Sequence, residues 1–187
     1  MSSIIEGGRW NAKEPMELIC KENVFSLSGD GFEIKAHNGR NMFKVEGHAM
    51  SMRDRKTMHA ADGTIVAELR EKAFSLHKGQ DVVDREGHFI FTVRKAGMIQ
   101  MVRSNLEIYL GDGDREIDFE VKGDFLSKSF KITKKSTGKE VANISRKGLN
   151  ASNMMFGADT YVVSVPTGGD MAFAVLVAIA ADEIYQE

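Results

Sequence analysis

Residues Met171 to Ala181 read MAFAVLVAIAA, eleven positions without a polar side chain near the end of the chain. Residues 166–169 (PTGG) stop the strand-like segment before them, Asp170 can cap a helix that follows, and residues 182–184 extend that helix by a turn. An Ala-rich segment of this length favours a helix over a strand. Because the predicted helix is apolar on every side, it must be surrounded by protein or by lipid.

Three surroundings are open for this helix: a sheet of the same chain, a lipid bilayer, or a partner chain. Eleven residues at about 1.5 Å per residue span roughly 17 Å, which is well short of the ~30 Å hydrocarbon core of a bilayer. A transmembrane span is therefore not expected. The rest of the sequence favours enclosure by a sheet.

The chain from Asn23 to Val165 is a series of short segments in which apolar and polar residues alternate. Alternation with a period of two indicates antiparallel strands with one buried face. Phe32 and Ile34, for example, alternate with charged residues before the turn signal Asn38-Gly39. The same arrangement recurs at further turn signals: Asp62-Gly63, Glu86-Gly87, Gly111 to Asp114, and Thr137-Gly138. These runs amount to roughly a dozen strands, a number typical of a sandwich or a barrel.

A closed barrel accounts for both patterns. About twelve strands, spaced about 4.8 Å apart and tilted by about 40°, close into a barrel roughly 24 Å across, which side chains alone do not fill. A helix on the barrel axis would fill it. We therefore predict a mainly β fold: a closed antiparallel β-barrel of about twelve strands enclosing a central hydrophobic C-terminal α-helix. We expect residues 1–187 to form a single domain, with residues 1–20 as an N-terminal extension.

Composition and charge narrow the class of protein. The chain has 25 Lys and Arg against 27 Asp and Glu, so no global basic bias points to nucleic acid. One cysteine, Cys20, cannot form an internal disulfide, and the start MSSIIEGGRW lacks the pattern of a secretory signal. We therefore expect an intracellular protein, cytoplasmic or peripheral at a membrane, with the nucleus left open. Trp10 is expected to pack locally against the barrel.

Four stretches, in order along nearly the whole chain, carry a resemblance: Asn23 to Val45 (NVFSLSGDGFEIKAHNGRNMFKV), Leu76-His77 within AFSLHKGQDVVD, Asp118 to Ile132 (DFEVKGDFLSKSFKI), and Asp159 to Ile184 (DTYVVSVPTGGDMAFAVLVAIAADEI). The most specific parts are the run DFE-x-KG-x-F-x-x-x-SFKI and the apolar helix that ends in Asp182-Glu183-Ile184. With these residues the chain resembles the LURP-one-related family of the tubby C-terminal-like group.

The resemblance implies a closed barrel threaded by a C-terminal helix, shared with tubby proteins and, by analogy, with phospholipid scramblases. Tubby domains bind phosphatidylinositol 4,5-bisphosphate through surface cations, and scramblases act at membranes. Family members are linked to plant defence, mostly without a defined biochemical activity. The resemblance does not place the tubby lipid-binding residues on numbered positions here, and a shared fold does not imply a shared function.

The largest charge feature lies between Lys122 and Lys147, where eight Lys and Arg stand against Asp124 and Glu140. If Phe130 and Ile132 point inward, alternation sends four lysines outward together. These are the candidate headgroup-binding residues Lys131, Lys135, Lys139 and Lys147, and a second candidate cluster is Arg53, Arg55 and Lys56. Such cations can hold an inositol phosphate or an anionic leaflet.

The alternative is a solvated charge ladder, that is, a solvent-exposed face on which the lysines pair with acidic residues of the neighbouring strand. Glu116, Asp118 and Glu120 point outward on the preceding strand, where they are expected to pair across to the segment that carries Lys131. The lysines would then neutralise an acidic neighbour.

Motifs for catalysis or metal binding are weak or missing. Gly111 to Asp114 begins like a calcium loop, but Ile117 stands where an EF-hand needs glycine and Gly123 where it needs the closing glutamate. The five histidines are never three to five residues apart, so none forms a local zinc pair. The sequence has no nucleophile elbow, P-loop or dinucleotide motif. We therefore predict no catalytic residue, no metal and no cofactor.

Two functions stay open. The first is a non-enzymatic, tubby-like binding module that recognises anionic phospholipid, including phosphoinositide, in membrane-linked or defence-type signalling. The second is a protein-interaction or scaffold domain without lipid affinity. An enzyme or a transporter ranks third, because it would need a polar cavity lined by carboxylates or histidines with shifted pKa values.

Overall fold

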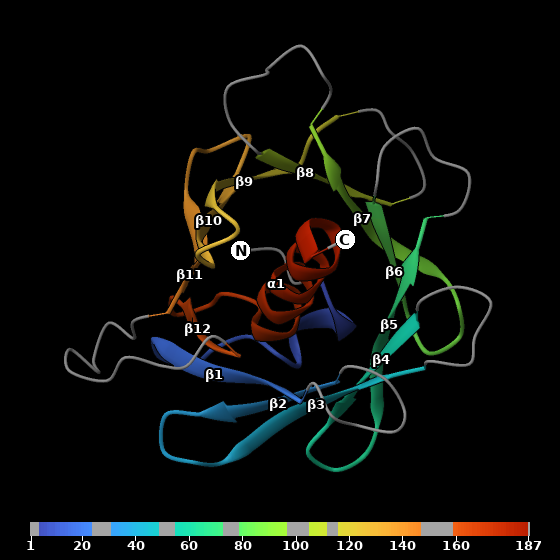
Figure 1. Cartoon of the computed structure of the whole chain (residues 1–187), viewed down its shortest axis with the longest axis vertical. Helices are drawn as coiled ribbons and strands as arrows, with labels where there is room; N and C mark the ends of the chain where they lie inside the picture. The colour runs from blue at the N-terminus through green and yellow to red at the C-terminus, as the bar shows by residue number, and fades with distance from the viewer. Residues whose placement is uncertain are drawn as a thin grey trace.

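The computed structural model describes residues 4–23, 31–48, 55–72, 79–96, 105–111, 116–146 and 159–186. In this part of the chain, twelve antiparallel strands form a closed barrel around one α-helix, α1 (Figure 1). The strands are β1 (Met16–Asn23), β2 (Gly31–Ala36), β3 (Asn41–Gly47), β4 (Arg55–Ala60), β5 (Ile65–Glu71), β6 (Gly79–Val83), β7 (Phe89–Lys95), β8 (Asn105–Leu110), β9 (Phe119–Asp124), β10 (Ser129–Lys134), β11 (Glu140–Ser145) and β12 (Thr160–Val165). The predicted barrel of about twelve strands is confirmed.

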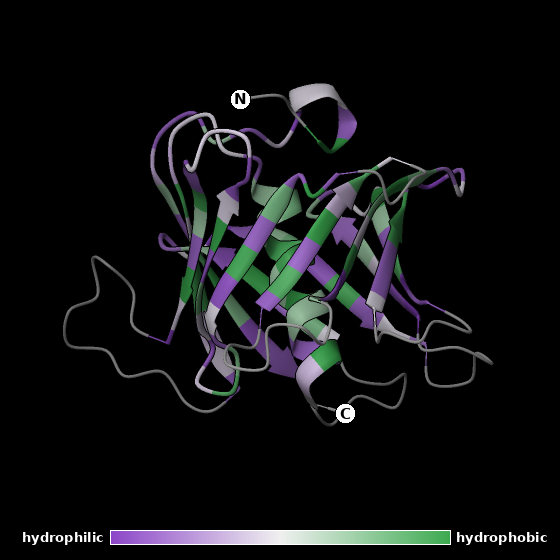
Figure 2. Cartoon of the chain, turned by 90° about the horizontal axis from the view of Figure 1, so that it is seen from above, coloured by the Kyte–Doolittle hydropathy of each residue, from purple (hydrophilic) through white to green (hydrophobic). Residues whose placement is uncertain are grey.

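Each strand pairs with its neighbours along the chain, and β1 closes the barrel by pairing with β12. Along β2 the apolar residues Phe32 and Ile34 are buried, whereas Glu33 and Lys35, which alternate with them, are exposed. The hydropathy of the strands in Figure 2 alternates in the same way. One face of the sheet therefore points into the barrel and the other into solvent.

The predicted hairpin turns form where glycine can adopt a positive φ. Gly39, Gly63, Gly87 and Gly138 have φ values of 83°, 83°, 87° and 65°. Most other residues are strained in this region of backbone space. Of the predicted turn from Gly111 to Asp114, residues 112–114 lie outside the described residues.

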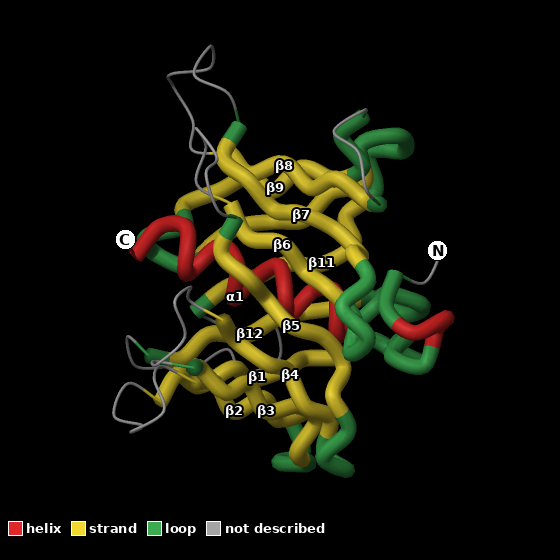
Figure 3. The backbone as a smooth tube through the Cα atoms, turned by 90° about the vertical axis from the view of Figure 1, so that its right-hand side faces the viewer, coloured by secondary structure: helices red, strands yellow, loops and turns green. Residues whose placement is uncertain are grey.

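The helix α1 (Met171–Gln186) runs through the barrel, as Figures 2 and 3 show from two sides. Every residue from Met171 to Ala181 is at most 7% exposed, so the predicted enclosure of this segment is confirmed. Phe173 fixes the helix against two walls, since its ring lies 5.1 Å from Phe91 and 5.0 Å from Phe119, measured between centroids. No helix in the described ranges has both the length and the apolar character needed to cross a membrane.

The predicted helix cap is also present. Asp170 accepts a hydrogen bond at Oδ1 from the backbone N–H of Phe173 at 3.0 Å. Its other oxygen, Oδ2, accepts from the N–H groups of Ile4 and Ile5 at 3.0 and 2.8 Å. One carboxylate therefore begins the helix and holds the N-terminal segment against it.

The N-terminal segment before β1 lies across the end of the barrel where α1 begins (Figure 3). It contains a short 3-10 turn, η1 (Glu6–Gly8), and then returns to the wall at Met16, the first residue of β1. The barrel wall begins at Met16: residues 16–21 pair with β12, and residues 18–23 pair with β2.

Candidate functional site

The described lysines of the first predicted cluster lie on the outer face of β10 and in the turn between β10 and β11. Phe130 and Ile132 are buried, as expected, and Lys131, Lys135 and Lys139 are exposed. Lys147 lies outside the described residues. The alternation of β10 therefore presents Lys131 to solvent, and Lys135 and Lys139 are exposed in the turn between β10 and β11.

Two of these three lysines are paired with carboxylates. Lys131 Nζ lies 3.0 Å from Glu140 Oε2, and Lys135 donates to Glu120. Glu120 also accepts from Lys122, and the hydrogen bonds from Lys122 first and Lys135 second hold its pKa below the usual value for glutamate. Most of the lysines on this surface are therefore neutralised by a neighbouring glutamate.

The strand register decides which charges meet. Glu120 lies opposite Thr133, one of the expected cross-strand positions, but Lys131 lies opposite Lys122. Lys131 therefore reaches sideways to Glu140 on β11 instead of to β9. Among the described residues, Lys139 and its neighbour Lys134 have no ion pair, which leaves two free cations beside the turn between β10 and β11.

The second predicted cluster does not form one surface. Arg53 lies outside the described residues, and Arg55 is exposed with Nη1 3.7 Å from Glu68 Oε2. Lys56, the next residue of β4, points into the barrel and is only 8% exposed. Its Nζ lies 3.2 Å from Glu183 Oε1 near the end of α1. Neighbouring residues of a strand face opposite ways, so Lys56 is a structural residue of the interior.

An acidic turn after β6 brings together Asp84, Glu86 and His88, with one ligand-type atom of each within 4.8 Å of the others. The bonding of Asp84 explains this group. Its Oδ1 accepts the backbone N–H groups of Glu86 and His88 at 2.9 and 2.8 Å, and its Oδ2 lies 3.1 Å from His88 Nδ1. The cluster is a turn closed by an aspartate.

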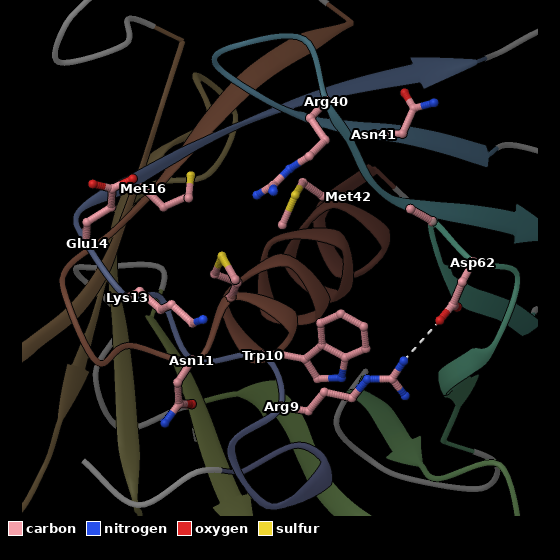
Figure 4. A pocket seen from close by; sticks show the side chains of 12 residues that line it. Arg9, Trp10, Asn11, Lys13, Glu14, Met16, Arg40, Asn41, Met42 and Asp62 are labelled. Atoms are coloured by element: carbon pink, nitrogen blue, oxygen red, sulfur yellow. Dashed lines mark hydrogen bonds and ion pairs between the residues drawn. The ribbon is translucent and has the colours of Figure 1, made fainter.

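A pocket of about 590 Å³, which the sequence did not predict, lies at the end of the barrel where α1 begins (Figure 4). We call it the mouth pocket. Its lining comes from separate parts of the chain: Arg9, Trp10, Asn11, Lys13, Glu14, Met16, Arg40, Asn41, Met42, Ala61, Asp62 and Met171. Trp10 packs edge-on against Phe43 with ring centroids 5.1 Å apart, as its expected local role requires, and also lines this pocket. The lining residues come together only when the chain folds, so no motif in the sequence indicates this pocket.

Comparisons with known proteins place the chain in a family. The sequence profile described as LURP-one-related matches residues 16–182. Protein LURP-one-related 15 of Arabidopsis thaliana is 26% identical over 98% of this chain and 87% of its own length. Protein LURP-one-related 12 of the same plant is 32% identical over 89% of this chain and 76% of its own length. Protein LURP1 is 26% identical over 97% of this chain and 89% of its own length.

The fold has a solved counterpart. An X-ray structure of a protein from Arabidopsis thaliana matches with a TM-score of 0.70 and 24% sequence identity, and the match covers 98% of this chain and 99% of that one. At this identity the likeness concerns the fold, a closed barrel around a C-terminal helix. Since the profile spans the barrel from the start of β1 into the last turns of α1, the chain belongs to the LURP-one-related family.

Proposed function

We propose that this barrel is a non-enzymatic binding module that recognises anionic phospholipid headgroups, phosphoinositides among them, on the outside of the β10–β11 hairpin. The observation that carries the proposal is the filling of the interior: α1 occupies the axis of the barrel with apolar side chains. A wide antiparallel barrel that binds a ligand inside keeps a cavity in that space, whereas here recognition is left to the outer surface and the barrel ends.

The turn between β10 and β11 supplies the cations. Lys134, Lys135 and Lys139 fall within six residues of the sequence, and Lys134 and Lys139 have no ion pair among the described residues. A basic residue near an anionic membrane surface contributes about 1 kcal/mol of binding free energy. Three such residues on one turn support weak, salt-sensitive attachment.

The existing ion pairs do not prevent this attachment. Lys131–Glu140 and Lys135–Glu120 are exposed pairs, and such pairs are generally worth only about 0–1 kcal/mol. A phosphomonoester carries about −1.5 to −2 charges near neutral pH, more than the single charge of a carboxylate. It can therefore displace the glutamates at small cost.

The same ion pairs favour a second function, a protein-interaction domain without lipid affinity. If Glu120 and Glu140 keep their lysines neutralised, the charged side chains hydrate the surface but give no net electrostatic attraction to an anionic membrane. The two functions predict different behaviour on vesicles.

Sedimentation with vesicles tests the proposal. Vesicles of phosphatidylcholine are compared with vesicles that also contain phosphatidylinositol 4,5-bisphosphate, at low and at physiological salt. We expect retention on the phosphoinositide vesicles alone, weakening as salt rises. The variant Lys135→Glu/Lys139→Glu should lose retention, and Glu120→Gln/Glu140→Gln should gain it.

The matched control is Lys35→Glu/Lys44→Glu, which makes the same change in net charge on β2 and β3, where each lysine is paired with a glutamate, as Lys135 is. This variant should bind like the wild type. Equal retention on both vesicle types, or none on either, would overturn the proposal and leave the protein-interaction function.

A further inference from the structure

The mouth pocket is a built feature of the fold. Its volume of about 590 Å³ falls in the ~300–1,000 Å³ range typical of small-molecule sites. Figure 4 shows it above the first turn of α1, between the N-terminal segment and the turns that carry Arg40 and Asp62. Met171, the first residue of α1, belongs to its lining.

Hydrogen bonds hold the wall formed by the N-terminal segment. Besides the two N–H groups bound by Asp170, the N–H of Met171 donates to the carbonyl of Trp10 at 3.0 Å. Ala12 and the Gly168-Gly169 turn exchange bonds as well: Ala12 N–H donates to Gly169 O at 2.8 Å and Gly168 N–H donates to Ala12 O at 2.7 Å. This wall is therefore fixed to the helix start and does not depend on a ligand for its position.

The inner lining of the pocket is apolar and adaptable. Trp10 is half-buried, and its indole N–H donates to Glu6 Oε2 at 3.0 Å, which sets the orientation of the ring. Met16 and Met42 are half-buried and Met171 is buried. Methionine side chains adjust their shape to an irregular apolar body and make favourable contacts with aromatic rings.

The charged side chains that line the pocket differ in whether they already form an ion pair. Arg9 already has partners: its guanidinium lies 3.0 Å from Asp62 Oδ2 and stacks over the Trp10 ring at 4.7 Å. Lys13 and Arg40 are exposed, and Figure 4 shows both side chains directed toward the centre of the pocket. In the part of the chain that the structure describes, neither forms an ion pair. Glu14 is the remaining lining carboxylate, so two unpaired cations stand against one anion.

We propose that the mouth pocket binds a small amphipathic acid: a free molecule with an apolar or aromatic body and one carboxylate, sulfonate or phosphate group. The body lies on Trp10 and the methionines, and the acid lies between Lys13 and Arg40. This inference does not rest on the proposed headgroup surface, which is formed by other residues on the β10–β11 hairpin.

Trp10 makes the site directly observable, because it is the one tryptophan of the chain. The probe is 8-anilino-1-naphthalenesulfonate, an aromatic body with one sulfonate, and its uncharged counterpart is N-phenyl-1-naphthylamine. A sulfonate probe in the pocket accepts energy from Trp10, so Trp10 emission should fall and saturate. We expect the uncharged probe to bind at least about tenfold more weakly, since a charged hydrogen bond worth about 1.4 kcal/mol changes affinity tenfold.

Variants assign the effect to the two cations. Lys13→Gln/Arg40→Gln should weaken binding of the sulfonate probe by about tenfold or more and change binding of the uncharged probe by less than about twofold. Glu14→Gln should strengthen binding of the sulfonate probe, because it removes the opposing charge. Both side chains of the double variant are exposed, so its thermal melting should match that of the wild type.

The control Lys135→Gln/Lys139→Gln removes the same amount of charge from the hairpin of the proposed headgroup surface and should bind the sulfonate probe like the wild type. Loss of vesicle binding with an intact Trp10 signal therefore counts against the proposed function alone. The mouth-pocket site is overturned if both probes bind equally, if the Lys13→Gln/Arg40→Gln variant binds the sulfonate probe as tightly as the wild type, or if the probe binds without quenching Trp10.

Discussion

The Nζ atom of Lys128 lies 3.0 Å from Oδ2 of Asp182, and this contact ties the barrel wall to the last turns of the helix inside it. Both side chains are about nine-tenths buried, and Glu22 Oε2 lies 3.6 Å from the same ammonium group. Lys56 makes a second tie to α1 through Glu183. Because the C-terminal end of a helix carries a partial negative charge, two buried lysines are favourably placed there.

Lys128→Met should destabilise the barrel strongly. The variant keeps most of the side-chain volume but leaves Asp182 and Glu22 as buried carboxylates without their shared cation. Breaking a buried ion pair from one side costs about 3–5 kcal/mol of unfolding free energy. Urea denaturation followed by circular dichroism measures the loss as a lower midpoint.

Two comparisons make this test specific. Asp182→Asn should cost less than Lys128→Met, because Lys128 keeps Glu22 as a partner. Lys131→Met removes an exposed lysine that is also ion-paired, and it should cost no more than about 1 kcal/mol. If Lys128→Met and Lys131→Met have the same midpoint, the Lys128 contact does not hold the helix.

Phe173→Ala should open a cavity between the helix and two strands of the wall. The ring of Phe173 packs against Phe91 on β7 and Phe119 on β9, and all three residues are buried. Removing a buried aromatic ring costs about 3–5 kcal/mol of unfolding free energy. Leu126→Ala is the control, since Leu126 is 79% exposed and its truncation should leave the urea midpoint almost unchanged. An unchanged midpoint for Phe173→Ala would show that the helix does not pack as described.

The fold could be predicted because each part of it has a local signature. The residues from Met171 to Ala181 have no polar side chain, and that alone requires a surrounding wall. Phe130 and Ile132 are apolar and alternate along β10, which indicates that they point inward and that Lys131 between them points outward. The same reasoning applies to Lys56, which is in phase with the buried Met58 on β4 and therefore points inward.

The sites depend on what the barrel brings together, which spacing along the chain does not show. The partner of Lys135 is Glu120, fifteen positions away, and the choice depends on the register of β9 against β10, in which Glu120 lies opposite Thr133. The mouth pocket combines Trp10 with Met171 from the opposite end of the sequence. Lys128 and Asp182 likewise meet only when the helix enters the barrel.

Two substitutions at Asp170 should separate its two roles. Asn caps a helix about as well as Asp, so Asp170→Asn keeps a hydrogen bond to the Phe173 N–H. The amide NH₂ group cannot accept hydrogen bonds from Ile4 and Ile5, so residues 4–9 should detach, whereas the backbone bonds of Trp10 and Ala12 to the helix start remain. Residues 4–9 should then become sensitive to limited proteolysis, and Trp10 emission should shift to longer wavelength because the indole loses its bond to Glu6.

Asp170→Ala should show the same detachment and lose about 1 kcal/mol more unfolding free energy than Asp170→Asn, because the helix cap is also gone. The interpretation fails if Asp170→Asn leaves both Trp10 emission and protease resistance at their wild-type values, since the N-terminal segment would then be held by other bonds.

Cys20 should report the opening of the barrel. It is the one cysteine of the chain, it is fully buried, and burial raises the pKa of its thiol far above the usual value, an effect that the nearby Lys128 only partly offsets. Because the thiolate is the reactive form, labelling by 5,5′-dithiobis(2-nitrobenzoate) near pH 8 should be slow in the native protein and fast in urea.

Lys128→Met and Phe173→Ala should accelerate native labelling by about tenfold for every 1.4 kcal/mol that each loses in stability, when labelling proceeds through open states. Native labelling as fast as in urea would place Cys20 outside a closed interior, and rates that do not follow stability would show that a smaller local opening exposes it.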